Sequence, residues 1–402
     1  MNQSIPSLSS LPAPAKGVTH YDYIFTGTGC AALSLLLRLL AHPQLQHKSV
    51  LLIDEQLKNQ NDRTWCFWEK EAGFFEPIVH HRWQQLQFTG NSGKQLFLTA
   101  PYTYKMIKGA DFYAHAFAVV LQSKAVVCAL QAQVQNICYN NQGAEVKVAD
   151  VCYTANYVFN SIPSFNLSSL AKQPKQLYPL VQHFKGWVIT TSQPAFDVST
   201  AVFMDFDVPQ NVGTAFVYLL PMANNKALVE YTFFNRQPLP PNAYDTLLQQ
   251  YLQNRGVNEY QIEETEIGAI PMTNRVFAPA NNNLIHLGTA GGQTKASSGF
   301  TFQFIQKHSE AIVQLLANHR HPVVAPGFFQ KRFALYDAVL LQVLWHNRLE
   351  GKAIFSNILA KQSIQTLFRF LDNETTLLEE VAIMHSVPTN IFLRAAIKEI
   401  AN

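Results

Sequence analysis

Two glycines separated by a single residue carry the clearest chemical signal in the sequence. A short apolar strand, Tyr23 to Phe25, runs into Gly27-Thr28-Gly29, and an apolar helical segment over residues 31–40 follows. A strand that turns tightly into a helix leaves free backbone N–H groups at the positive end of the helix, where a phosphate can bind. Gly27 supplies the tight turn, Gly29 lets the backbone approach a pyrophosphate, and Ala32 stands where a third glycine would permit close packing of helix on strand. Residues 21–40 therefore predict a dinucleotide-binding turn.

An acidic residue follows where such a site requires one. The next apolar strand, residues 49–53, ends in Asp54. A carboxylate at this position accepts a hydrogen bond from a ribose hydroxyl and disfavours a 2′-phosphate, which fits the adenosine ribose of FAD or NAD. Because a lone G-x-G-x-x-G/A occurs by chance in many chains, the alternative is a glycine turn that binds no nucleotide. Strand, helix and acid in register favour the nucleotide site.

A second glycine-rich turn lies far along the chain. Residues 283–287 form a strand-like segment that ends in the loop Gly288 to Gly299, and a helical segment over 300–316 follows. This loop could bring another helix N-terminus to the same pyrophosphate. The alternative is an ordinary surface loop.

Composition excludes several classes of protein. The chain has 402 residues, of which 48% are hydrophobic and only 14% charged, so it can bury a large core and an apolar cavity. The formal net charge of +3 is too small to argue for nucleic acid. The five cysteines lack metal-ligand spacing, which predicts reduced thiols, no metal site and a cytoplasmic location.

Hydropathy patterning predicts a chain that does not span a membrane. Arg38 and Gln342 interrupt the longest apolar runs, and residues 1–20 lack the charged start and apolar block of a signal peptide, so we expect a flexible tail there. The oligomeric state is left open.

The remaining pattern predicts an α/β fold with a discontinuous Rossmann-like domain, an inserted and mainly antiparallel β domain, and a helical C-terminal region. Local signals include a hairpin around 90–93, helices over 109–121 and 244–254, and a strand over 260–270. Residues 125–138 and 144–148 are expected to form another hairpin. We expect the Rossmann-like domain to comprise residues 21–80, 105–165 and 281–320, the β domain 81–104 and 166–280, and the C-terminal region 321–402.

Motifs spread from Tyr21 to Ile397 resemble, in consistent order, the FAD-containing lycopene cyclases of the bacterial single-chain type, the lycopene β-cyclases. They are YDYIFTGTGCAALSLLLRL, LLIDEQ, NDRTWCFWE, YKMIKGADFY, QHFKGWVI, VFMDF, ALVEYT, EIGAIPM, GTAGGQTKASSGFTF and RFLDNETTLLEEVAIM. The resemblance implies a glutathione-reductase-type flavoprotein with bound FAD, active in its reduced form, and NAD(P)H as the reductant. It also implies a non-redox isomerisation that closes the ends of lycopene, or a related linear carotenoid, to β-ionone rings by protonation and carbocation cyclisation.

The same resemblance assigns the acid. Family members carry an essential glutamate in a setting that matches Glu230 in ALVEYT, and its apolar neighbours would raise its pKa so that it keeps a proton near neutral pH. Tyr231 departs from the family pattern, which often has a second acid there. Asp205 in VFMDF could orient Glu230 or simply cap a turn. Glu266 in EIGAIPM could be a base near the isoalloxazine or a buried structural partner.

Cofactor residues implied by the resemblance are Gly27, Gly29, Ala32, Asp54 and Arg63 on the nucleotide side, and Gly288, Gly291, Gly292 and Gly299 near the pyrophosphate and flavin. Aromatic faces would stabilise the carbocation, and we expect two or three of six candidates to contact substrate. These are Trp65, Phe67, Trp68, Trp187, Tyr218 and Phe300.

Because lycopene resides in membranes, we expect peripheral association with a membrane surface. Residues 328–345, followed by His346 and Arg348, mix apolar and basic side chains as an interfacial helix would, and residues 366–371 are a second candidate. The alternative is a bundle helix packed on the core. Alternative functions are an FAD-dependent hydroxylase or monooxygenase of the same fold, another carotenoid-ring-forming cyclase, and a non-catalytic flavoprotein or carotenoid-binding module.

Overall fold

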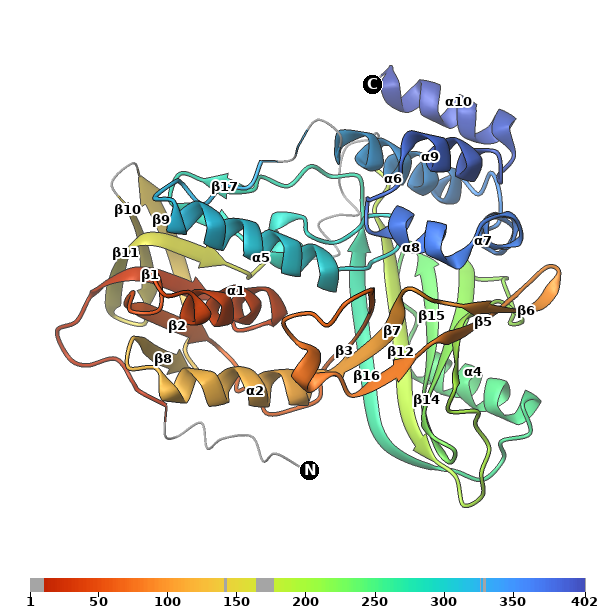
Figure 1. Ribbon diagram of the computed structural model, residues 1–402, viewed down its shortest axis with the longest axis horizontal. Coiled ribbons are helices and arrows are strands. Elements are labelled where there is room, and N and C mark those ends of the chain that lie inside the picture. Colours follow the sequence, from red (N-terminus) through yellow and green to blue (C-terminus); the bar gives the residue numbers. More distant parts are fainter. Residues whose placement is uncertain (1–10, 141–142, 164–176, 326, 328–329, 402) are drawn as a thin grey trace.

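The computed structural model describes residues 11–140, 143–163, 177–325, 327 and 330–401 (Figure 1). Parts of four predicted regions therefore lie outside the described residues: 1–10 of the tail, 141–142 of a hairpin loop, 164–176 near the start of the β domain, and Phe328 and Phe329 of the interfacial segment. The division of the chain into domains at the stated boundaries stays a prediction.

A mainly parallel sheet forms the half of the molecule that carries the glycine turn (Figure 1). Its order is β17-β18-β11-β1-β2-β8, with β9 and β10 as an antiparallel ribbon on β11. The strands are β1 (His20–Thr26), β2 (Val50–Asp54), β8 (Val126–Leu130), β9 (Val134–Asn140), β10 (Gly143–Val148), β11 (Val151–Asn160), β17 (Ala280–Asn281) and β18 (Leu284–His286).

Alternating side chains of this sheet pack against different layers. Phe25 and Leu52 point toward the helices α1 (Cys30–Ala41), α2 (Gly109–Gln122) and α5 (Phe302–Ala317). Ile24 and Leu51 point to the other face, where they pack with Val146 of the ribbon. Successive side chains of a strand point to opposite faces, so a continuous apolar run is what a strand covered on both faces requires.

The prediction of one continuous strand over residues 125–138 is wrong, because these residues form two strands. The segment is divided into β8 and β9 at Gln131, whose φ of 58° lies in the left-handed region that a strand cannot continue through. The hairpin with residues 144–148 is present, formed by β9 and β10.

A second sheet forms the other half of the molecule, in the order β16-β12-β15-β14-β13-β5-β6. Only the β13–β5 pairing is parallel. Helix α4 (Pro241–Asn254) covers one face through Tyr244 and Leu248, and the other face looks toward the nucleotide half. The strands are β5 (Gln85–Gly90), β6 (Gly93–Leu98), β12 (Leu180–Thr190), β13 (Thr200–Asp205), β14 (Thr214–Ala223), β15 (Lys226–Asn235) and β16 (Gln261–Met272).

A small sheet and a helical region complete the fold. Strands β3 (Thr64–Glu69), β7 (Thr103–Lys108) and β4 (His81–Trp83) lie between the two larger sheets. At one end of the second sheet stand the C-terminal helices (Figure 1), which are α6 (Gln330–Trp345), α7 (Gly351–Lys361), α8 (Ile364–Leu371), α9 (Leu377–Met384) and α10 (Thr389–Ile400).

The segment predicted as an interfacial helix packs instead as a bundle helix. Val339, Leu341 and Val343 of α6 are buried in the core shared with the second sheet. Leu367 and Phe368 of α8, the second candidate, belong to the same core. Side chains that already fill a core cannot insert into lipid, so neither helix offers its apolar face to a membrane. Within the described parts of the chain, no helix combines the length and hydropathy needed to span a bilayer.

Candidate active site

The predicted turn joins β1 to α1 with the geometry that phosphate binding needs. Gly27 has φ of +86°, and a Cβ there would lie 2.4 Å from the Oγ of Ser161, so the turn excludes any larger residue. Gly29 caps α1, and within the described part of the chain no atom lies within 4 Å of the place its Cβ would take. Both glycines line one large cavity. The open space at Gly29 therefore leaves room for an anionic group at the N-terminus of α1.

Asp54 holds this turn and lines the same cavity. Its Oδ2 accepts hydrogen bonds from the backbone N–H of Thr28 at 2.6 Å and from the Thr28 hydroxyl at 2.8 Å. Its Oδ1 accepts from the N–H of Gln56 at 2.8 Å. Since a carboxylate offers about four lone pairs, Oδ1 retains one for a ribose hydroxyl.

The second glycine loop approaches the first. Gly288 has φ of +59°, and a Cβ on it would come within 2.9 Å of the Cβ of Ala31 at the start of α1. Gly288 and Gly299 line the cavity, as do Thr301 and Phe302 at the start of α5. Two helix N-termini, α1 and α5, thus border one cavity.

Three of the predicted cofactor residues serve the shape of these turns without lining the cavity. A Cβ on Gly291 would collide with the carbonyl of His286, and one on Gly292 would touch Phe277. Ala32 is fully buried in the helical core, where its small side chain allows close packing. Gly291 and Gly292 therefore help to fix the conformation of the second glycine loop, and Ala32 helps to fix the packing of α1.

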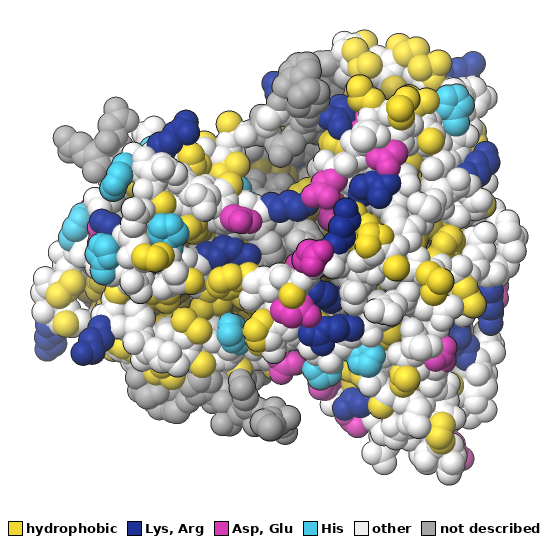
Figure 2. Space-filling view, viewed as in Figure 1, with side chains coloured by type: hydrophobic (Ala, Val, Ile, Leu, Met, Phe, Trp, Pro, Cys, Tyr) yellow, Lys and Arg dark blue, Asp and Glu magenta, His cyan; other side chains and the backbone are white. Residues whose placement is uncertain are grey.

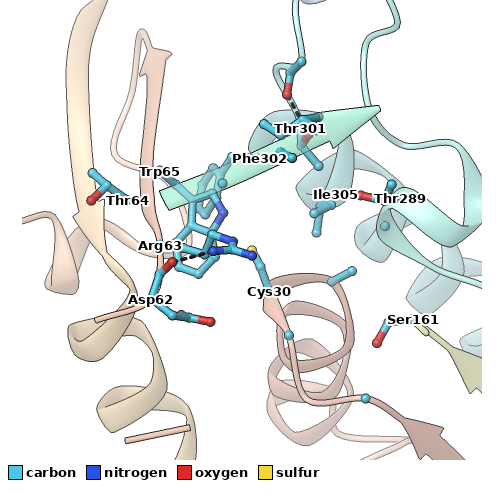
Figure 3. Close-up of a pocket in the computed structure, with 18 of the residues that line it drawn as sticks. Cys30, Asp62, Arg63, Thr64, Trp65, Ser161, Thr289, Thr301, Phe302 and Ile305 are labelled. Atoms are coloured by element: carbon cyan, nitrogen blue, oxygen red, sulfur yellow. Dashed lines mark hydrogen bonds between the residues drawn. The ribbon is translucent and has the colours of Figure 1, made fainter. Parts of the chain in front are cut away.

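The cavity has a volume of about 1160 Å³ and runs from the glycine turns to the second sheet. Figure 2 shows the molecule hollowed near the middle of this face, between its two halves. Pockets for small ligands usually measure 300–1,000 Å³, so this volume suits an extended ligand. In Figure 3 the Arg63 side chain lies beside Trp65 and reaches toward Cys30 at the start of α1.

Unpaired polar atoms in the wall indicate where a polar ligand would bind. Asp62 Oδ1, Gln182 Oε1 and Ser298 Oγ are buried, find no hydrogen-bond partner among the described residues, and belong to residues that line the cavity. Buried polar groups are rarely left unpaired in folded proteins. With the glycine turns and Asp54, these atoms fit a dinucleotide such as FAD.

Where the second sheet borders the cavity, Glu230 of the cavity wall meets a second carboxyl group across a glycine. In the second sheet Tyr218, Glu230, Gly186 and Glu266 occupy one row across β14, β15, β12 and β16. Gly186 separates the two glutamates, and a Cβ on it would approach Glu266 Oε1 to 3.2 Å. The missing side chain gives the two carboxyl groups room to lean toward each other, because a glycine inside a strand lets neighbours approach closely.

Hydroxyl groups orient both glutamates. The Thr232 hydroxyl donates to Glu230 Oε1 at 2.7 Å, and the Thr64 hydroxyl donates to Glu266 Oε2 at 2.8 Å. Burial raises the pKa of Glu230 well above its ordinary value, and the neighbouring Glu266 raises it further. Burial also raises the pKa of Glu266, while the Thr64 hydrogen bond opposes that rise. Burial and the neighbouring carboxyl group of Glu266 thus both favour the neutral, protonated form of Glu230.

Asp205 lies apart from Glu230, on the α4 side of the sheet. It accepts hydrogen bonds from the Tyr251 hydroxyl and from Arg255 Nη2, each at 2.9 Å. Tyr231, one residue after Glu230, points to the same side and stacks on Phe233 beneath α4. Asp205 is therefore not a partner of Glu230. Tyr231, the residue that departs from the family motif, lies outside the cavity.

Of the six aromatic candidates, Trp65, Tyr218 and Phe300 line the cavity. The other three serve the core. Phe67 stacks on Phe302 with ring centroids 4.3 Å apart, Trp68 stacks on Phe368 at 4.4 Å, and Trp187 packs on the α4 side.

Several residues in the wall were missed from the sequence. Thr64, Cys66 and Tyr104 line the cavity from β3 and β7, and Gly186 lies between the two glutamates. A glycine in the middle of the apolar strand QHFKGWVI was the available signal for Gly186, since such glycines often mark close approach. Among the described residues, no cluster of His, Cys, Asp or Glu could hold a metal ion.

The parallel sheet with its glycine turn, the second antiparallel sheet and the cavity between them define a Rossmann-type flavoprotein fold. The structure resembles a flavoprotein/dehydrogenase from Cytophaga hutchinsonii with a TM-score of 0.62 and 10% identity, covering 94% of this chain and all (100%) of that one. It also resembles a variant of the halogenase PltM in complex with FAD, with a TM-score of 0.56 and 12% identity over 87% of this chain and 78% of the halogenase.

The chain belongs to the family described as lycopene cyclase protein, whose pattern matches residues 22–397. It is also 24% identical over 260 residues to a lycopene beta-cyclase from Pantoea ananas. That match spans 63% of this chain and 63% of the relative.

Proposed function

We propose that this protein is a lycopene β-cyclase, which closes the linear ends of lycopene to β-ionone rings and forms γ-carotene or β-carotene. The observation that carries this proposal is Glu230 in the wall of a dinucleotide-sized cavity, paired with Glu266 across Gly186, in a chain of the lycopene cyclase family. A carboxyl group held neutral at physiological pH is what protonation of a carbon–carbon double bond demands.

Reduced FAD is the proposed cofactor, with NAD(P)H as its reductant. Gly27, Gly29 and Asp54 would hold the adenosine and pyrophosphate groups, and Gly288 and Gly299 would border the flavin end. Arg63, exposed at the cavity mouth, would add positive charge. When bound and reduced, the flavin supplies fixed negative charge that stabilises a neighbouring cation without being consumed.

Glu230 would donate its proton to the terminal double bond of the polyene. Thr232 and Glu266 hold its carboxyl group in place. The resulting tertiary cation is attacked by an internal double bond, which forms the ring bond and moves the positive charge into the ring. Tyr218 and Tyr104 in the cavity wall present aromatic faces to this charge. Loss of a ring proton to the carboxylate of the pair restores Glu230, so substrate and product are isomers.

We also propose that the protein binds a membrane surface, through a patch different from the one expected from sequence. The apolar patch of α9 and α10 comprises exposed side chains, and the basic side chains of Arg394 and Lys398 on α10 are exposed beside it. Figure 2 shows hydrophobic side chains gathered over α10 at the top of the view. Apolar side chains interleaved with basic ones favour anionic lipid, in which a polyene would also dissolve. The patch consists of Leu377, Leu378, Val381, Met384, Leu393, Ile397 and Ile400.

Liposome co-sedimentation tests this surface. We expect binding to vesicles of anionic phospholipid, and its loss in the double variant Leu378→Asp, Ile397→Asp. Val276→Asp replaces an apolar residue that is 91% exposed outside the patch and serves as the matched control. Equal sedimentation of all three proteins would contradict docking through α9 and α10.

The main experiment combines purified protein, chemically reduced FAD and lycopene under anaerobic conditions. We expect cyclic product with the mass of lycopene and no oxygen requirement, whereas a monooxygenase would consume NAD(P)H and oxygen with each product. Glu230→Gln should retain FAD and lose cyclisation. Asp205→Asn removes a carboxyl group from the opposite face of the same sheet and should remain active. Folded, FAD-loaded wild-type protein that leaves lycopene unchanged would refute the proposal.

A further inference from the structure

A second cavity lies between the second sheet and the helices α7 and α8. It is small, about 30 Å³, and most of its wall is apolar. Phe203 and Phe234 line it from the sheet, and Phe355, Ile358 and Leu359 line it from α7. We call this space the α7 slot.

The α7 slot adjoins the end of the main cavity that holds Glu230. Tyr218, Ser298 and Phe300 belong to the walls of both spaces. Glu230 and Phe234 lie on the same face of β15, four residues apart, which corresponds to about 13 Å along a strand. The slot thus continues the line of the sheet face from Glu230 toward α7.

Aromatic rings form the boundary between the two spaces. Phe203 lies 5.8 Å from Tyr218 and 6.4 Å from Phe300, measured between ring centroids. On the slot side, Phe234 lies 6.1 Å from Phe355. These aromatic side chains, which belong to separate elements, are all that the shared wall places between the slot and the main cavity at Tyr218 and Phe300.

The opposite end of the main cavity has a different chemistry. Lys58, Asp62 and Arg63 line it together with the glycine turns, which suit a dinucleotide. A long hydrocarbon with one end at Glu230 gains free energy by leaving water for apolar walls. The α7 slot offers such walls, and the polar end does not.

Backbone strain marks the floor of the slot. Met204, which lines it, has φ of +66°, and β13 has an irregular register between Val202 and Asp205. Non-glycine residues in this conformation are uncommon, and strained positions gather at ligand sites. The volume of about 30 Å³ holds roughly one water molecule, so entry of a chain requires outward movement of half-buried side chains such as Phe355 and Ile358.

We propose that the α7 slot receives the linear chain of the polyene while its end lies at Glu230. This inference rests on the proposed function and adds the location of the substrate chain. It gives Phe355 and Ile358 the role of limiting the width of the space for the substrate chain, a role separate from proton transfer and from cofactor binding.

The test compares two tryptophan substitutions on the same helix. Ile358→Trp fills the slot, whereas Ala360→Trp adds the same side chain at an exposed position of α7. We expect Ile358→Trp to lower kcat/KM for lycopene at least tenfold and to weaken lycopene binding to the oxidised, inactive protein by a similar factor. FAD content should be unchanged, and Ala360→Trp should match the wild type in every measurement.

A second variant guards against simple misfolding of Ile358→Trp. Phe355→Ala widens the slot, and we expect it to bind lycopene at least as tightly as the wild type with the same FAD content. If Ile358→Trp binds and cyclises lycopene like Ala360→Trp, or if Phe355→Ala weakens binding as much as Ile358→Trp does, the slot is not the binding site. An inactive wild type with reduced FAD bound would instead overturn the proposed function, and this inference with it.

Discussion

Glu230 and Glu266 stand on either side of Gly186 in three adjacent strands, and the absent side chain of that glycine lets their carboxyl groups interact. Because two neighbouring carboxyl groups cannot both ionise at low cost, the pair retains a proton. The arrangement and the burial of the pair raise the pKa of Glu230, so its carboxyl group favours the neutral form more than that of an exposed glutamate does.

Gly186→Ala tests this arrangement directly. The new Cβ would lie 3.1 Å from Glu266 Cγ and 3.1 Å from Leu228 Cδ1, so the Glu266 and Leu228 side chains must shift by a few tenths of an ångström, and Glu266 moves away from its present position beside Glu230. We expect cyclisation to fall about tenfold, which equals about 1.4 kcal/mol of transition-state stabilisation, with FAD content unchanged. Thr265→Ala, next to Glu266 but exposed, is the control. Unchanged turnover in Gly186→Ala would show that the close approach is dispensable.

The pH dependence of cyclisation should reflect the ionisation of Glu230 and the effect of Glu266 on its pKa. Ionisation of Glu230 removes the acid, so the single-turnover rate with prereduced FAD should fall on the alkaline side. Glu266 raises the pKa of Glu230, and in Glu266→Gln that contribution is lost, which moves the alkaline limb to lower pH. Burial still keeps the pKa of Glu230 above its ordinary value in this variant. Glu263→Gln alters a carboxylate of the same strand that pairs with Lys226, and its limb should coincide with that of the wild type.

Substitution of the two glycines of the nucleotide turn, Gly27 and Gly29, should affect stability and FAD binding differently. Gly27→Ala places a Cβ 2.4 Å from Ser161 Oγ at φ of +86°, so both the thermal midpoint of the apoprotein and its FAD content should fall. Gly29→Ala meets no atom of the described residues within 4 Å and has an ordinary φ of −74°, so the apoprotein should remain as stable as the wild type. Its Cβ projects into the cavity, and flavin absorbance per chain should still drop. Full FAD loading of Gly29→Ala would remove this turn from the cofactor site.

Stability should depend on pH through Asp372. Burial raises the pKa of Asp372 to about 7, while in the unfolded chain the pKa is about 4. The folded protein therefore binds the proton more tightly, and stability is lost as pH rises from about 4 through about 7, by up to about 4 kcal/mol.

In Asp372→Asn this loss should be absent, because the amide does not titrate yet can still accept the hydrogen bond from Trp68 Nε1. Thermal midpoints of the two proteins should agree near pH 4, and the variant should be higher at pH 8. A variant that is less stable than the wild type at pH 8 would contradict this prediction.

Local chemistry made part of the site predictable. The glycine turn, Asp54 and the second glycine loop depend on a few consecutive residues whose backbone conformations their own side chains allow. The prediction of an interfacial helix was wrong because it depended on contacts between distant segments. Residues 328–345 have the composition of an interfacial helix, but burial depends on what packs against them, and α6 packs in the core.

By itself, the sequence determined the nucleotide turn, the α/β class and the family motif that contains Glu230, because each is written in neighbouring residues. Only the tertiary structure decided the partner of Glu230. Strand pairing brings Glu266 to it across Gly186, and the alternation of side chains along a strand turns Tyr231 away. Asp205 lies in an equally suggestive motif, yet its strand directs it to Arg255 on the opposite face. Register and face are set by packing among distant segments, which a motif does not record.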